Sequence, residues 1–177
     1  MSRFVIFLRA INVGGHAVIK ETLQKAFVSL GFSNVSTYKQ SGNVIFECAT
    51  ANPETVNLQV KDKLRAVLGY EVEVFVRTIA QLKQIIESEP FKGKVEGGTS
   101  FLVTFLEKAP AKFPLTLPIA IPKSTAEIIE SRGSEVFSIT RGHGDGGKPN
   151  PFLESRLKMK TTTRNWNVIV EIVQKSN

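Results

Sequence analysis

The chain has 177 residues, of which 42% are hydrophobic, and a formal net charge of +7 at pH 7, so it is long enough for one good core or two small cores that share an interface. No apolar run approaches the roughly 20 residues of a membrane helix, and Arg9 ends the opening run without a cleavage pattern behind it, so we expect a cytoplasmic protein without a membrane anchor. The single cysteine, Cys48, excludes an internal disulfide, and with only His16 and His143 beside it no zinc-ligand spacing exists, so we expect no metal and no cofactor.

The first half of the chain predicts strands and helices in alternation. Residues 3–10 are almost wholly apolar and β-prone, which indicates a central strand buried on both faces. Residues 20–30 carry apolar side chains at helical spacing, and Gly31 is a fitting stop. The further elements are a hairpin of strands over 35–39 and 43–48, a helix from Pro53 that ends at Gly69, a strand over 72–76, and a helix from Ile79 that Pro90 stops. The order β-α-β-β-α-β is typical of a ferredoxin-like sandwich.

The second half predicts a further α+β arrangement. Its expected elements are a strand over 100–106, a hairpin of strands over 127–130 and 135–140, a flexible glycine loop over 142–147, a helix through Phe152 and Leu157, and a last helix over 164–173. Prolines at 110, 114, 118 and 122 exclude a long helix between the first of these strands and the hairpin. We therefore expect a ferredoxin-like unit over 1–78 and a second α+β unit over 79–177, packed closely on the first.

Positive charge is concentrated in the second half. Residues 1–89 carry ten Lys and Arg against eight Asp and Glu, whereas residues 90–177 carry thirteen against eight. Within that half, residues 148–164 hold five basic side chains against Glu154. Such a patch favours a polyanionic or phosphorylated partner, although on charge alone a solvated face that keeps the protein soluble is the simpler explanation.

Two polar turns are expected to meet at one edge of the predicted sheet. In the β-α-β-β-α-β order the third strand lies beside the first and starts where the first ends, so residues 12–16 and 40–43 lie side by side. Their glycine and amide-bearing residues indicate a backbone anion-binding nest, beside which Arg9 requires a carboxylate or a bound anion. The structural alternative is that the glycines only permit positive φ and the asparagines cap backbone groups.

A catalytic version of this edge has few candidate groups. His16 and Ser41 are the available base and nucleophile, but the spacing identifies no third group to orient them. The sequence therefore leaves open whether the protein is an enzyme.

The segment TTTRNWN, residues 161–167, contains natural helix N-cap residues. We expect the threonines to cap the last helix. Arg164 in its first turn opposes the helix dipole, so an acidic side chain or an anion bound at the helix start is expected beside it. Trp166 is expected in the core rather than stacked on a ligand.

Three segments together resemble one known family. LRAINVGG at 8–15, TYKQSGNVIF at 37–46 and TTTRNWN at 161–167 are similar to the start, the hairpin and the late element of an uncharacterised bacterial family, domain of unknown function 1697. The resemblance implies a cytosolic α+β protein of two ferredoxin-like units and supplies no activity. Ala10 stands where the family commonly has glycine, so close backbone approach is not essential there. The glycine loop over 142–147 is looser than the basic segment expected in this family. Lys148 and Asn150, which follow it, are therefore better candidates for ligand contacts than the loop itself.

We expect a small anionic or phosphate-bearing ligand where the loop after the first strand, the hairpin and the start of the last helix converge. The expected ligand-binding residues are Arg9, Asn12, Gly14, Gly15, His16, Ser41, Gly42, Asn43, Lys148, Thr163, Arg164 and Asn165. RNA binding by the basic second half is an alternative, although the strand over 43–48 lacks the aromatics of an RNP1 segment. The other alternative is a purely structural or oligomerising module. The sequence leaves the oligomeric state open.

Overall fold

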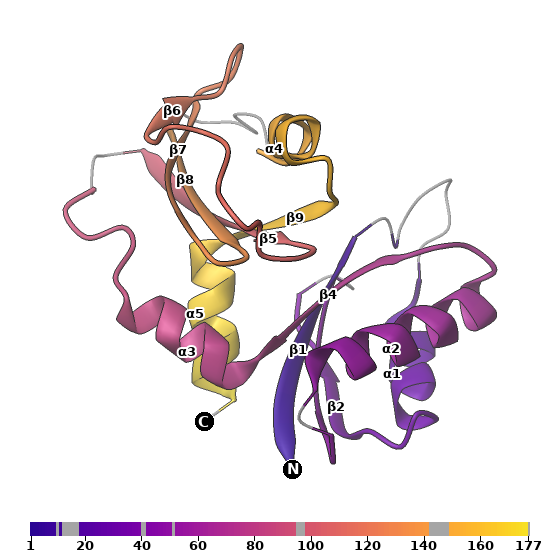
Figure 1. Ribbon diagram of the computed structural model, residues 1–177. Helices are drawn as coiled ribbons and strands as arrows, with labels where there is room; N and C mark the ends of the chain where they lie inside the picture. The colour runs from indigo at the N-terminus through magenta and orange to yellow at the C-terminus, as the bar shows by residue number, and fades with distance from the viewer. Residues whose placement is uncertain are drawn as a thin grey trace. The chain divides into compact units, whose positions relative to one another are not determined.

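A computed structural model describes residues 1–9, 11, 18–39, 42–50, 52–94, 98–141 and 149–176. The chain forms two compact units, Met1–Leu82 (unit 1) and Lys83–Asn177 (unit 2), each with one antiparallel sheet (Figure 1). The described residues contain five helices beside these sheets, so the fold is mixed α+β. None of these helices is long and apolar enough to cross a membrane.

Unit 1 contains the predicted alternation of strands and helices. Its elements are β1 (Ser2–Arg9), α1 (Lys20–Val28), β2 (Ser33–Thr37), β3 (Asn43–Cys48), α2 (Pro53–Leu68) and β4 (Glu73–Thr78), followed by the start of α3 (Ile79–Glu87), in which the unit boundary falls. The sheet order is β2-β3-β1-β4, so β1 lies between β3 and β4. Each predicted element of this half is confirmed within a few residues.

The ends of α2 show why the local sequence predicts this half well. The side chain of Asn52 accepts hydrogen bonds from the backbone N–H groups of Glu54 and Thr55, and Pro53 stands in the first turn. Gly69 ends the helix with φ of 79°, a left-handed conformation that favours glycine. Capping residues at both ends therefore define where the helix begins and ends.

The core of unit 1 lies between one face of the sheet and the helices α1 and α2 (Figure 1). Alternate residues of β1, Phe4, Ile6 and Leu8, point to this side and are buried. Phe46 of β3 is fully buried among three other rings, with ring centroids 5.8 Å from Phe4, 5.3 Å from Phe27 and 4.5 Å from Phe32. The aromatic group joins the sheet to α1 and to the turn that follows it.

Unit 2 contains a five-stranded sheet. After α3 its elements are β5 (Thr99–Leu106), β6 (Ile119–Ala120), β7 (Ala126–Arg132), β8 (Glu135–Arg141), α4 (Asn150–Leu157), β9 (Thr161–Asn165) and α5 (Trp166–Lys175). The sheet order is β6-β7-β8-β5-β9. Apart from the short β6, the strands therefore follow the same order as in unit 1, with β7, β8, β5 and β9 in the places of β2, β3, β1 and β4. The proline-containing connector, residues 107–118, stands where unit 1 has its first crossover helix.

The two faces of the sheet of unit 2 have different covers. On one face, Leu106, Ile128 and Val136 pack with Leu153 of α4. On the other face, Phe137 and Phe101 meet Phe91, whose ring centroid lies 5.1 Å from that of Trp166 at the start of α5. The sequence predicts that Trp166 is buried in the core. It is instead half-buried and packs within this aromatic group.

The predicted start of the last helix is wrong. Residues 161–165 form the strand β9, which pairs with β5 through Thr104↔Thr163 and Val103↔Arg164, and the helix begins only at Trp166. The threonines therefore do not cap a helix, and Arg164 does not stand in a first helical turn. Threonine is a β-branched residue that suits strands as well as caps, and pairing with β5 decides between the two.

Candidate functional site

The end of β1 and the start of β3 lie side by side, as predicted. Phe7 is the cross-strand partner of Asn43, and the backbone N–H of Leu8 donates to the carbonyl of Gly42 at 2.7 Å. The two polar segments that follow β1 and precede β3 therefore leave the sheet from neighbouring points. We call this place the β1–β3 edge of unit 1; Arg9, Gly42 and Asn43 are its described members.

Asn43 holds the hairpin together. Its side chain is 5% exposed, and its Nδ2 donates to the carbonyl oxygen of Tyr38 at 2.9 Å, while the backbone N–H of Tyr38 donates to the carbonyl of Asn43 at 3.0 Å. Lys39, in the same turn, has φ of 49°. The side-chain amide of Asn43 therefore caps a backbone group of the turn, as expected if the asparagines have a structural role rather than a ligand-binding one.

Two contacts fix the chain just before and after the end of β1. Arg9 is half-buried and lies directly opposite Glu73 of β4 in the strand register, and the carboxylate of Glu73 pairs with Lys61 of α2 at 3.7 Å. The hydroxyl of Tyr70 donates to the carbonyl of Ile11 at 2.6 Å. The backbone on this side of the β1–β3 edge is therefore anchored on β4 and on the segment that follows α2.

Several predicted ligand-binding residues lie outside the described residues. They are Asn12, Gly14, Gly15, His16, Ser41 and Lys148. Of the predicted set, the structure describes Arg9, Gly42 and Asn43 in unit 1 and Thr163, Arg164 and Asn165 in unit 2.

The second face of the sheet of unit 1 does not offer rings to nucleotide bases. This face carries Val5 and Phe7 of β1 and Ile45 of β3, which alternate with the residues that pack on the helices. All three are buried, with at most 8% exposure. Base stacking on the strands, as in RNA-binding sheets of this strand order, requires exposed aromatic side chains at such positions.

The three predicted residues of unit 2 do not converge. Thr163 faces α4, whereas Arg164, the next residue of β9, points to the opposite face of the sheet. There the guanidinium of Arg164 donates to the hydroxyl of Thr162 and to the carbonyl of Thr163, at 2.8 and 2.9 Å, and burial lowers the pKa of Arg164 to about 10. Asn165 is exposed at the end of the strand and its side chain does not cap α5.

A buried hydroxyl network joins β5, β9 and α4. The Oδ1 atom of Asn150 accepts hydrogen bonds from the hydroxyls of Thr161 and Thr163, at 3.0 and 2.7 Å, and the hydroxyl oxygens of Thr163 and Thr104 lie 2.8 Å apart. Because the single hydroxyl hydrogen of Thr163 is used in its hydrogen bond to Asn150, the hydroxyl of Thr104 is the donor in the bond between Thr104 and Thr163. The backbone N–H of Thr161 also donates to Glu154 of α4, at 2.9 Å.

Sequence reasoning did not find this network. The available signal is the alternation of Thr161 and Thr163, which is the spacing of two residues on one face of a strand. Because both hydroxyls donate to Asn150, these threonines hold α4 on the sheet by hydrogen bonds. Among the described residues, no group of three His, Cys, Asp or Glu side chains is placed to hold a metal ion.

Among the described residues, the side-chain oxygen of Ser138 on β8 is buried without a hydrogen-bond partner. The residue is fully buried on the α4 face of the sheet. A buried hydroxyl without a partner has lost its water and gained nothing in return. We expect Ser138→Ala to raise the free energy of unfolding by about 1 kcal/mol in urea denaturation, because it removes this cost. A loss of similar size instead would show that the hydroxyl has a partner in solution.

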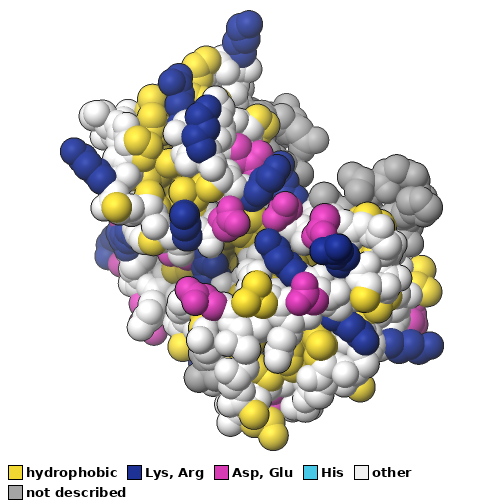
Figure 2. All heavy atoms as spheres, turned by 45° about the vertical axis from the view of Figure 1, so that its right-hand side comes forward, with side chains coloured by type: hydrophobic (Ala, Val, Ile, Leu, Met, Phe, Trp, Pro, Cys, Tyr) yellow, Lys and Arg dark blue, Asp and Glu magenta, His cyan; other side chains and the backbone are white. Residues whose placement is uncertain are grey.

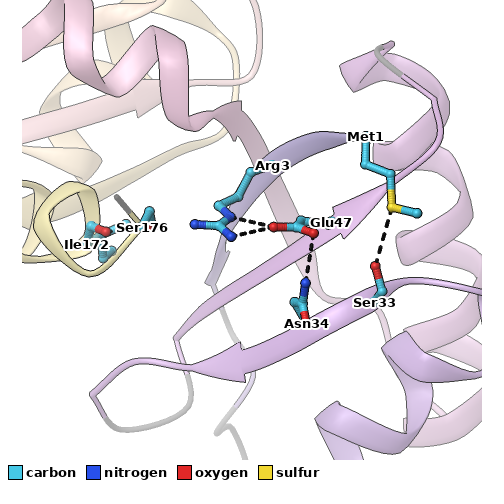
Figure 3. A network of polar contacts seen from close by, with 7 residues as sticks. All are labelled: Met1, Arg3, Ser33, Asn34, Glu47, Ile172 and Ser176. Atoms are coloured by element: carbon cyan, nitrogen blue, oxygen red, sulfur yellow. Dashed lines mark hydrogen bonds and ion pairs between the residues drawn. The ribbon is translucent and has the colours of Figure 1, made fainter.

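An ion pair closes the opposite end of the sheet of unit 1. Arg3 of β1 donates through Nε to Glu47 of β3 at 2.8 Å and also through its second guanidinium nitrogen, and Asn34 donates to the other carboxylate oxygen at 2.8 Å (Figure 3). The hydrogen bonds from Arg3, and then the one from Asn34, hold the pKa of Glu47 below its ordinary value. Among the described residues, these hydrogen bonds join β1, β2 and β3 at this end of the sheet.

Comparisons with known proteins agree with a mixed α+β chain of two antiparallel sheets. The chain belongs to the family described as protein of unknown function (DUF1697), whose model matches residues 1–137. Its fold is similar to that of the conserved bacterial protein SP0830 from Streptococcus pneumoniae, with a TM-score of 0.67 over 99% of this chain and 98% of that one, at 17% sequence identity. At this identity the likeness concerns the fold alone. No curated protein matches the chain.

Proposed function

We propose that the protein binds a small anionic, phosphate-bearing ligand at the β1–β3 edge of unit 1, in the cytoplasm. The observation that carries the proposal is the hydrogen bond from Leu8 to Gly42, because it brings two polar segments of the sequence to one point of the sheet. These segments supply glycines and amides, whose backbone N–H groups suit an anion, and Arg9 supplies a positive charge beside them. Asn43 is assigned to hold the turn rather than to contact the ligand.

We further propose that both units are ferredoxin-like. The order of elements in unit 1, together with an antiparallel sheet in which β1 lies between β3 and β4, supports this for the first unit. The matching strand order supports it for the second, with the connector in place of one helix. The boundary after residue 78 stays a prediction.

A ligand screen tests the function. We expect one class among inorganic phosphate, nucleotides and sugar phosphates to raise the melting temperature in proportion to the logarithm of its concentration. Arg9→Gln is expected to weaken that ligand about tenfold or more in isothermal titration, because a charge-assisted hydrogen bond is lost. Arg65→Gln is the matched control, since Arg65 is an exposed arginine on α2 that pairs with Glu71.

Two results would overturn the proposal. One is the absence of any concentration-dependent stabilisation of the wild-type protein by the three ligand classes. The other is equal ligand affinity of the Arg9→Gln and wild-type proteins, because the positive charge at the edge would then have no part in binding.

A further inference from the structure

Unit 2 carries a surface of clustered positive charge that the proposed ligand site does not use. Its members are the exposed side chains of Lys108, Lys112, Arg156, Lys158 and Lys160, which we call the basic surface. In Figure 2, Lys and Arg side chains lie among hydrophobic ones over the part of unit 2 where Figure 1 has β6 and α4.

Backbone pairing brings the two ends of the basic surface together. Leu106 of β5 is the cross-strand partner of Thr161 of β9, and one residue further the N–H of Glu107 donates to the carbonyl of Lys160 at 3.2 Å. Lys108 and Lys160 therefore belong to adjacent segments, although they are far apart in the sequence.

Packing joins the remaining members. Phe113 and Leu117 of the connector share one apolar cluster with Leu157 and Met159, which follow each other closely at the end of α4. Lys112, Arg156 and Lys158 are each next in the chain to one of these half-buried residues, so they emerge beside the cluster. Because the apolar side chains pack on the cluster, the cations are left as the solvent-facing groups.

Few negative charges oppose these five cations. Residues 107–118 and 150–160 contain two carboxylates, those of Glu107 and Glu154, against the five positive charges of the basic surface. Arg156 lies over the ring of Phe152, with its guanidinium carbon 5.4 Å from the centroid, which leaves its edge available for hydrogen bonds. A polyanion, which carries negative charges at regular intervals, matches such a surface better than a small ligand with a single anionic group.

We propose that the basic surface binds the phosphodiester backbone of a nucleic acid without reading its sequence. Lysines are flexible point charges that suit phosphates in series, and four of the five cations are lysines. An anionic membrane fits less well, since a peripheral membrane surface also needs exposed apolar side chains to insert, and here the neighbouring ones are half-buried in the cluster.

The test is fluorescence anisotropy with labelled oligouridylate across a series of salt concentrations. We expect the double variants Lys108→Gln/Lys112→Gln and Lys158→Gln/Lys160→Gln each to weaken binding about tenfold or more and to reduce the slope of log K against log salt by about 1.4. The control is Lys20→Gln/Lys25→Gln, which removes the same charge from exposed positions on α1. Arg65→Gln is expected to leave this binding close to that of the wild type, because Arg65 belongs to neither proposed site.

Several results would contradict the proposal. They are the absence of binding at low salt, equal weakening by the α1 control, and stronger binding to phosphatidylserine vesicles or to polyglutamate than to oligouridylate. Melting temperatures of all variants are measured in parallel, and since every substituted lysine is exposed we expect these to stay close to that of the wild type.

Discussion

Phe46→Ala is expected to lower the free energy of unfolding of unit 1 by about 3–5 kcal/mol. The side chain is fully buried, and its ring is in contact distance of three others that belong to β1, α1 and the turn after α1. Its removal opens a cavity at the point where these three parts meet, and it also removes the favourable ring pairs. Urea denaturation followed by far-UV circular dichroism measures the loss.

Two further variants make this result specific. Phe46→Leu keeps most of the volume and is expected to cost less than half as much as Phe46→Ala. Val67→Ala changes a side chain on α2 that is 44% exposed, and we expect a change below about 0.5 kcal/mol. If Phe46→Ala cost no more than Val67→Ala, the aromatic group would not be the centre of this core.

Asn150→Leu is expected to lower the free energy of unfolding of unit 2 by about 2–4 kcal/mol. One oxygen of Asn150 accepts hydrogen bonds from Thr161 and Thr163, both of which lie in the buried part of β9. Leucine removes the oxygen to which both hydroxyls donate, and each buried polar group that loses its hydrogen bond costs about 1–3 kcal/mol. The fluorescence of Trp166, the single tryptophan, follows the unfolding of this unit during urea denaturation.

The conservative variant separates this explanation from simple loss of packing. Asn150→Asp retains an oxygen in the same place and adds a negative charge at the start of α4, so we expect it to keep most of the stability. Removal of the donors by Thr161→Val and Thr163→Val in the Asn150→Leu background should restore part of the loss. Equal destabilisation by leucine and aspartate would show that the accepting oxygen is not what matters.

The first half of the fold could be predicted from the sequence because its signals are local. The two ends of α2 are marked by residues next to the helix itself, namely Asn52 and Pro53 at its start and Gly69 at its end. The second half could not be predicted as well, since the threonines at 161–163 suit either a helix cap or a strand. Their assignment depends on β5, a strand more than fifty residues earlier in the chain, and such pairing is not written in the local sequence.

The candidate site divides in the same way. That the end of β1 meets the start of β3 follows from the order of elements alone, and the contact of Leu8 with Gly42 confirms it. That Glu73 lies opposite Arg9 depends on the register of β4, and that Thr163 and Arg164 face opposite sides depends on recognising β9 as a strand. Topology can be predicted from a pattern of elements, whereas register decides which side chains meet.

The connector that replaces a helix in unit 2 also bears on the entropy of the unfolded chain. Ordering the backbone of one residue costs about 1–2 kcal/mol of conformational entropy at room temperature. Proline has a fixed φ and restricts the residue before it, so a segment with a proline at every fourth position, from Pro110 to Pro122, explores fewer conformations before folding. A crossover of this composition loses less freedom on folding than a flexible loop of equal length, and it can lie on the sheet without the internal hydrogen bonds of a helix.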